Sequence, residues 1–118
     1  MVELHIREAL QKRVEETVEY VLANVPACTV YLFGSFAKRK IKPTSDIDLL
    51  VLVDQPLSLR EIRDLRIQLN NAYEEKIHFE YEVDIKVYYK QHFEEKLQKP
   101  SFEREIYKYM IKVGDNHE

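Results

Sequence analysis

Residues 34–53 of this 118-residue chain read GSFAKRKIKPTSDIDLLVLV, and this stretch decides which fold we expect. Residues 46–53 in its second half predict a strand. Because the residues after the two aspartates are all apolar, we expect the far end of this strand to be buried on both faces. The run CTVYLF over residues 28–33 is β-branched and aromatic, which predicts another strand that ends at Gly34. The basic segment between these strands contains Pro43 and is expected to be a loop.

Helices are expected on either side of these strands. Apolar residues at spacings of three and four predict a helix from about Leu4 to Asn24. Ser58 followed by Glu61 is the pattern of a capping box, and it predicts the start of a helix that ends near Lys76. Apolar and charged residues alternate over residues 81–89, which predicts a third strand.

The last part of the sequence predicts two more helices. A short helix is expected over residues 91–98, and Ser101 is expected to cap a final helix. Gly114 is expected to be the residue just beyond that helix, with a frayed tail over residues 115–118. The final helix is expected to bury an apolar stripe made of Phe102, Ile106, Tyr109, Met110 and Val113.

These elements together predict a small α/β (α+β) domain, in which helices flank a mixed sheet of three or more strands. We expect a single domain over residues 1–118, because the length is close to the common domain size and the sequence contains no linker or repeat. The composition, with 45% apolar and 33% charged residues, is ordinary for a soluble globular protein.

Charge and cysteine content limit the expected partners and compartment. The net charge of −3 gives no reason to expect nucleic acid or an anionic membrane as a partner. Charged residues run through the N-terminal segment, so we expect no signal peptide there, and no apolar run approaches the roughly 18 residues of a membrane span. Cys28 is the one cysteine, so we expect a buried thiol and a reducing, cytoplasmic location.

Asp46 and Asp48 are the sharpest chemical feature of the sequence. Residues two apart on a strand point to the same side, so these carboxylates are expected to stand together. Two adjacent carboxylates repel each other unless a cation lies between them, and Mg²⁺ is commonly held by one or two carboxylates plus substrate phosphates. The alternative is structural, because an aspartate at a strand start can also cap a turn.

Asp84 strengthens the metal interpretation. It lies in the middle of the third predicted strand, where aspartate is disfavoured. If that strand pairs beside the second, Asp84 joins the same carboxylate face, and three carboxylates can hold two metal ions. The alternative is that Glu82, Asp84 and Lys86 form the solvent face of an edge strand.

Gly34 and Ser35 could supply a phosphate site beside these acids. A glycine allows close approach of the backbone to a ligand, and the N–H groups of a helix start favour an anion. Alone, the pair could equally be a plain turn. Ten residues separate Ser35 from Asp46. At average residue frequencies, Gly-Ser, that gap and Asp-x-Asp would coincide by chance in roughly one chain in a thousand.

The pattern Gly-Ser-x10-Asp-x-Asp resembles the signature of the DNA polymerase beta nucleotidyltransferase superfamily, and the chain looks most like its minimal nucleotidyltransferases. Ala37 and Ser45 match positions of the family pattern. Lys38 stands where arginine is usual, and Arg39 replaces the second glycine of the family pattern. Asp84 matches the third carboxylate of the family by its spacing and its strand context.

The resemblance implies a polymerase beta-like palm fold and transfer of a nucleoside monophosphate, AMP from ATP, to a hydroxyl group. It implies two Mg²⁺ ions as cofactors and a partner protein as acceptor. Minimal nucleotidyltransferases are commonly paired as antitoxins with a HEPN toxin. By position, Asp46, Asp48 and Asp84 would be the catalytic metal ligands, and Gly34, Ser35, Lys38 and Ser45 would hold the nucleotide.

Two other functions stay open at this point. One is an antitoxin of the same fold that acts by binding its partner with weak or no catalysis, which Arg39 in place of the glycine favours. The other is a nucleotidyltransferase for a small molecule of the aminoglycoside type, for which the short chain leaves little room unless an oligomer supplies the acceptor site. The sequence is compatible with a homo- or hetero-oligomer in each case.

Overall fold

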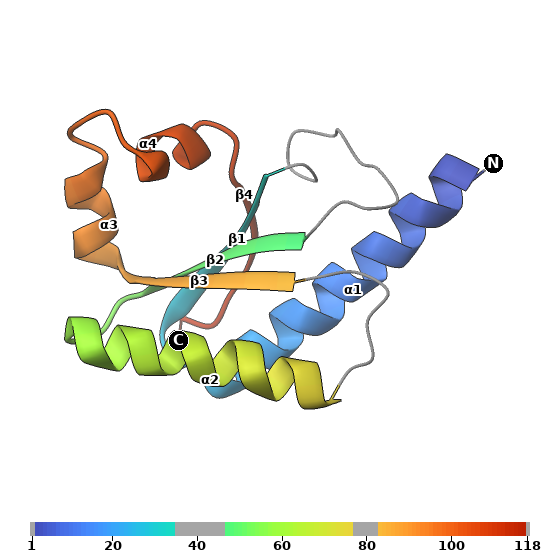
Figure 1. Ribbon diagram of the computed structural model, residues 1–118, viewed down its shortest axis with the longest axis horizontal. Helices are drawn as coiled ribbons and strands as arrows, with labels where there is room; N and C mark the ends of the chain where they lie inside the picture. The colour runs from blue at the N-terminus through green and yellow to red at the C-terminus, as the bar shows by residue number, and fades with distance from the viewer. Residues whose placement is uncertain (1, 35–46, 77–82, 118) are drawn as a thin grey trace.

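The computed structural model describes residues 2–34, 47–76 and 83–117, which form one four-stranded sheet with helices on both faces (Figure 1). This architecture confirms the expected α/β fold. The elements in chain order are α1 (Val2–Asn24), β1 (Cys28–Phe33), β2 (Ile47–Val53), α2 (Leu59–Lys76), β3 (Val83–Tyr89), α3 (Lys90–Lys96), α4 (Phe102–Tyr107) and β4 (Ile111–Asp115).

The sheet is mixed, as expected, and its strand order is β3-β2-β1-β4. The strand pairs β1–β2 and β1–β4 are antiparallel, whereas β2 and β3 are parallel. Parallel neighbours need a crossover connection, and α2 provides it. The helices α1 and α2 lie on one side of the sheet, and α3 and α4 lie on the other (Figure 1).

The central strand β2 contributes to two cores because both of its faces are covered by helices. Ile47, Leu49 and Val51 point toward α1 and α2 and are fully buried. Leu50 and Leu52 point the opposite way and pack with Phe93 of α3 and Ile106 of α4. Apolar residues on both faces of a strand produce the continuous hydrophobic run that identified β2 in the sequence.

Local capping signals start two of the helices as predicted. At α2, the Glu61 backbone N–H donates to Ser58 Oγ and the Ser58 N–H donates to Glu61 Oε1, both at 3.1 Å. At α4, the Arg104 N–H donates to Ser101 Oγ at 3.1 Å. These bonds satisfy backbone donors that a helix start leaves without intrahelical partners.

The predicted extent of the last helix is wrong. The helix α4 ends at Tyr107, and residues 111–115 form β4, which pairs with β1 and gives that strand a second neighbour. Gly114 is therefore not a residue that follows a helix. A Cβ atom at Gly114 would lie 2.9 Å from Val18 Cγ1 of α1, so the glycine lets β4 approach that helix closely.

The expected frayed tail is also contradicted up to His117, because the side chain of Asn116 fixes it to the end of α1. Asn116 Nδ2 donates to the carbonyl oxygens of Leu22 at 3.0 Å and Val25 at 2.5 Å. Asn116 Oδ1 accepts from the Cys28 backbone N–H at 2.7 Å. One amide side chain thus satisfies three backbone groups where α1 passes into β1.

Cys28 is buried, as expected from its apolar neighbours. The pKa of the thiol is raised to about 11, mainly by its burial and to a smaller extent by the nearby carboxylates of Asp54 and Asp115. The protonated thiol therefore behaves as a small apolar side chain. In the same described part of the chain, no helix combines the length and the apolar character that a membrane crossing needs.

Replacement of Asn116 by alanine should lower the free energy of unfolding by about 2–3 kcal/mol, because buried backbone groups would lose their partners. Urea denaturation followed by circular dichroism measures this change. Asn24→Ala is the matched control, since its side-chain amide makes one exposed bond, to the Tyr20 carbonyl. Equal destabilisation by the two variants would contradict the role of Asn116.

Candidate functional site

The structure describes part of the predicted site. Gly34 directly follows β1, Asp48 lies on β2, and Asp84 lies on β3. The other predicted site residues, Ser35, Lys38, Ser45 and Asp46, lie outside the described residues.

Asp48 and Asp84 are direct partners in the register of the parallel strands β2 and β3. Neighbouring strands lie about 4.8 Å apart, so the two residues are adjacent on one face of the sheet. This is the face that α3 and α4 cover, because Leu50 alternates with Leu49 and points to the same side as Asp48. The third strand therefore does pair beside the second, as the metal interpretation requires.

Gly34 lies against the carboxyl group of Asp48. Its φ angle is +79°, a left-handed conformation that glycine adopts without strain. A Cβ atom at this position would collide with Asp48 Oδ2 and would lie 3.2 Å from Asp48 Cγ. The glycine is thus needed twice, for the backbone turn after β1 and for the space that the carboxyl group occupies.

Lys86 adds a positive charge to this face, since it lies two residues after Asp84 on β3. Its Nζ is 3.1 Å from Asp84 Oδ2 and 5.6 Å from the centroid of the Phe102 ring. Asp84 is exposed on an edge strand, as the alternative interpretation expected, yet it also faces Asp48. The two descriptions of Asp84 are therefore compatible.

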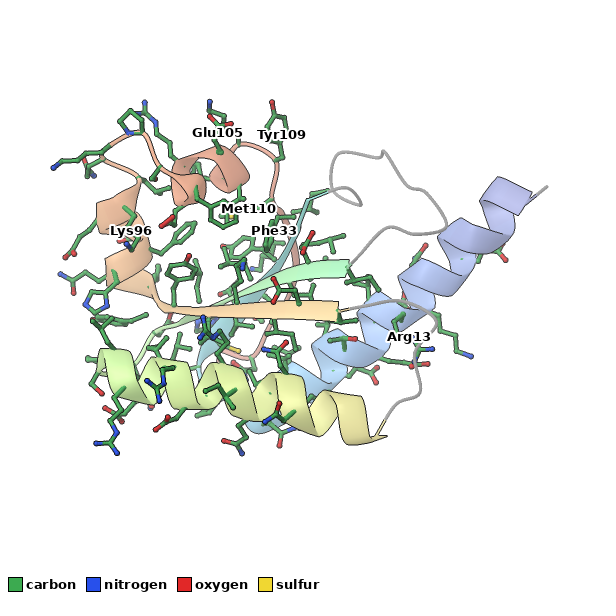
Figure 2. All side chains as sticks on the ribbon, viewed as in Figure 1. Arg13, Phe33, Lys96, Glu105, Tyr109 and Met110 are labelled. Atoms are coloured by element: carbon green, nitrogen blue, oxygen red, sulfur yellow. The ribbon has the colours of Figure 1, made fainter. Side chains whose placement is uncertain are left out.

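A pocket of about 440 Å³ opens beside Gly34 and Asp48. Its other wall comes from α4 and the residues after it, and includes Phe102 and Tyr109. The Phe102 ring packs edge-on against Phe33 with 6.2 Å between centroids. In Figure 2, Phe33 lies between the sheet and α4, whereas the Tyr109 side chain points away from the sheet. The pocket thus has an acidic end and an aromatic end.

The aromatic end of this pocket differs from the sequence-based expectation. Phe102 and Tyr109 were expected on the buried stripe of the last helix, but their exposed fractions are 51% and 48%. The stripe assignment holds for Ile106, which is buried. Strand alternation from Asp84 could have identified Lys86, whereas no sequence signal pointed to Phe102 and Tyr109, because the helix that carries the stripe ends early.

The chemistry of Asp48 and Asp84 suits a hard cation such as Mg²⁺, which prefers carboxylate oxygens and often uses only one or two of them. Within residues 2–34, 47–76 and 83–117, no group of three or more His, Cys, Asp or Glu side chains is placed to hold a metal ion. The third predicted ligand, Asp46, is outside these ranges.

Comparison with known proteins supports the resemblance to the polymerase beta nucleotidyltransferases. The family model described as "Polymerase beta, Nucleotidyltransferase" matches residues 15–108. This match covers most of the chain and includes the whole Gly-Ser to Asp-x-Asp segment and Asp84. A search of curated protein sequences finds no significant match.

Several solved structures share the fold at low sequence identity. A protein of Sulfolobus solfataricus described as a candidate nucleotidyltransferase has a TM-score of 0.62 and 19% identity, over 95% of this chain and 86% of that one. A chain of a toxin–antitoxin with AMP-PNP has a TM-score of 0.51 and 22% identity, over 86% and 73%. A mutant of the toxin–antitoxin MntA-HpeT has a TM-score of 0.50 and 20% identity, over 86% and 72%.

Gly34→Ala should lower the free energy of unfolding by about 1–3 kcal/mol, because the methyl group would be strained at this φ and would collide with Asp48. Thermal denaturation of the variant measures the loss. The double variant Gly34→Ala/Asp48→Ala removes the collision and keeps the backbone strain, so a double-mutant cycle separates the two causes. Strict additivity in that cycle would show that the carboxyl group does not restrict position 34.

Proposed function

The chain belongs to the polymerase beta nucleotidyltransferase family, and we propose that it transfers AMP from ATP to a hydroxyl group of a partner protein. The observation that carries the proposal is the register that sets Asp48 beside Asp84, with Gly34 against the Asp48 carboxyl group. It places two acids and a close backbone turn at one end of the sheet. Such a site suits a nucleoside triphosphate with its divalent cation.

Asp46, Asp48 and Asp84 would hold Mg²⁺ in this proposal. Bound Mg²⁺ would offset the negative charge of the triphosphate and of the departing pyrophosphate. The exposure of Asp84 is compatible with this role, because the ion must be reached by a substrate that arrives from solvent. The Lys86 ammonium would have to leave Asp84 Oδ2, or share it, when the cation binds.

The reaction exchanges a phosphoanhydride bond of ATP for a phosphoester bond to the acceptor. The acceptor oxygen forms a bond to the α-phosphorus of ATP, the bond from that phosphorus to the bridging oxygen breaks, and pyrophosphate leaves. Asp84 would accept the proton of the attacking hydroxyl. Gly34 and Ser35 would contact the triphosphate through backbone N–H groups and the hydroxyl, and Lys38 would add positive charge near the leaving group.

A protein acceptor is supported by the shape of the site. The pocket opens past Asp48 to exposed Phe102 and Tyr109, which offer an apolar wall that suits an aromatic side chain such as tyrosine. Structures of toxin–antitoxins share this fold, and the family resemblance implies a HEPN toxin as the partner. We therefore propose that the chain is an antitoxin that modifies such a toxin.

A second function, inhibition of the partner by binding alone, has one observation in its favour. Arg39 replaces a glycine of the family pattern inside the segment that would contact the triphosphate. A bulky side chain there could weaken nucleotide binding without any effect on a protein interface elsewhere.

Incubation of the chain with labelled ATP, Mg²⁺ and the purified product of the neighbouring gene should transfer label to that protein. Asp48→Asn should reduce the rate by about 100-fold or more, since the ion contributes several kcal/mol and each 1.4 kcal/mol is a factor of ten. Asp64→Asn is the matched control, because Asp64 is exposed on α2, which packs on the face of the sheet opposite to Asp48.

Undiminished transfer by Asp48→Asn would overturn the assignment of the metal site. A complex that forms tightly without any transfer, and that Asp48→Asn leaves intact, would favour inhibition by binding. Transfer of label to a small molecule but not to the protein would show that the proposed protein acceptor is wrong.

A further inference from the structure

The free edge of β3 borders a second, larger pocket of about 750 Å³, distinct from the pocket at Asp48. Its lining residues come from the N-terminal half of α2, from β3 and from the α3–α4 region. Figure 1 shows these elements together at the side of the sheet that is formed by β3. We call it the β3 groove, and define it by the residues Arg66, Val87, Tyr89, Lys96 and Lys99.

The backbone of β3 shows which atoms face this groove. The Asn70 side chain, from α2, pairs with both the N–H of Ile85 at 3.1 Å and its C=O at 3.0 Å. The peptide groups of Ile85 therefore point away from β2, toward the free edge. Because this direction alternates along a strand, the N–H and C=O of Val87 point to the same edge.

Asn70 and Val87 divide the edge into a closed part and an open part. The side-chain amide of Asn70 imitates one residue of a further strand and blocks the edge at Ile85. Among the described residues, no such side chain pairs with the outward peptide groups of Val87. Val87 itself is buried, but it lines the groove, and outward peptide groups without partners are a template for an added strand.

The charge of the β3 groove is opposite to that of the chain as a whole. The residues around it include four basic side chains, Arg66, Lys86, Lys96 and Lys99, and two acidic ones, Glu95 and Glu103, whereas the chain has a net charge of −3. Glu103 lies 3.8 Å from Lys96. Neither Arg66 nor Lys99 forms an ion pair with another described residue.

We propose that the β3 groove binds an extended, acidic segment of a partner protein, which adds a short strand beside Val87. Main-chain bonds to Val87 would supply affinity, and contacts of acidic side chains with Arg66 and Lys99 would supply specificity. Leu59, which is 76% exposed at the rim, and Tyr89 would contact the apolar side chains of the segment. This binding does not depend on the transfer reaction.

Two other occupants fit the observations less well. A second copy of the chain, paired edge to edge through β3, would bring the same basic side chains together, and like charges across strands are destabilising. A nucleic acid would satisfy the basic side chains, but it lacks the alternating N–H and C=O groups that the Val87 edge can pair with.

Amide hydrogen exchange by NMR tests the proposal on the full chain. The probe is a short blocked peptide of alternating valine and glutamate. In the free protein, the Val87 amide should exchange faster than those of Lys86 and Tyr88, which point to β2. Addition of the peptide should slow exchange at Val87 and shift resonances of Arg66 and Lys99.

Matched peptides and variants separate strand addition from simple charge attraction. Arg66→Glu/Lys99→Glu should weaken binding by roughly tenfold or more, because charge-assisted contacts are lost. Arg63→Glu/Lys12→Glu carries the same charge change on exposed residues outside the groove and should bind normally. A peptide that is N-methylated on alternate amides should also bind at least about tenfold more weakly, since it lacks the donors for Val87.

Four results would overturn the proposal. The first is equal binding of a valine–lysine peptide. The second is binding that N-methylation leaves unchanged, which would mean attraction of charge without an added strand. The third is protection of Val87 that appears with protein concentration and without peptide, which would identify a second copy as the occupant. The fourth is binding of a single-stranded oligonucleotide in place of the acidic peptide, which would identify nucleic acid as the occupant.

Discussion

The register between β2 and β3 is the constraint on which the other features depend. Side chains alternate along each strand, so a shift by one residue would send Asp84 into the core beneath α1 and α2 and would expose Ile85. Burial of an unpaired carboxylate there is far more costly than burial of isoleucine. The hydrophobic core on one face of the sheet therefore fixes the position of the acidic pair on the other face. The two carboxyl groups need not contact each other for this.

Much of this arrangement could be predicted from the sequence because its causes are local. The capping box at Ser58 and the apolar run of β2 act over a few residues, and the chemical pattern of Gly34 with Asp48 has a specific spacing. The strand β4 could not be predicted in the same way. Its residues continue the helical spacing of α4, and only a partner strand about eighty residues earlier selects the extended form.

Lys86 connects the two pockets, since it borders both. Its position follows from strand alternation, which places it on the same face as Asp84, and from the edge location of β3, which leaves its ammonium partly exposed. A partner segment in the β3 groove and a nucleotide at Asp48 would thus meet the same side chain. Phe102, which lines the pocket at Asp48, lies under the Lys86 ammonium.

The contacts of β4 and Asn116 with β1 also affect the order in which the chain folds. The Cys28 N–H bonds to a side chain 88 residues later, so the loop that this contact closes includes β2, β3 and three helices. Such distant contacts slow folding, and they can form only after the intervening chain has left the ribosome. Until then β1 has one open edge, and a nascent chain at this stage is exposed to strand exchange with its neighbours on a polysome. In the completed sheet, β4 pairs with this edge of β1 and so prevents such exchange.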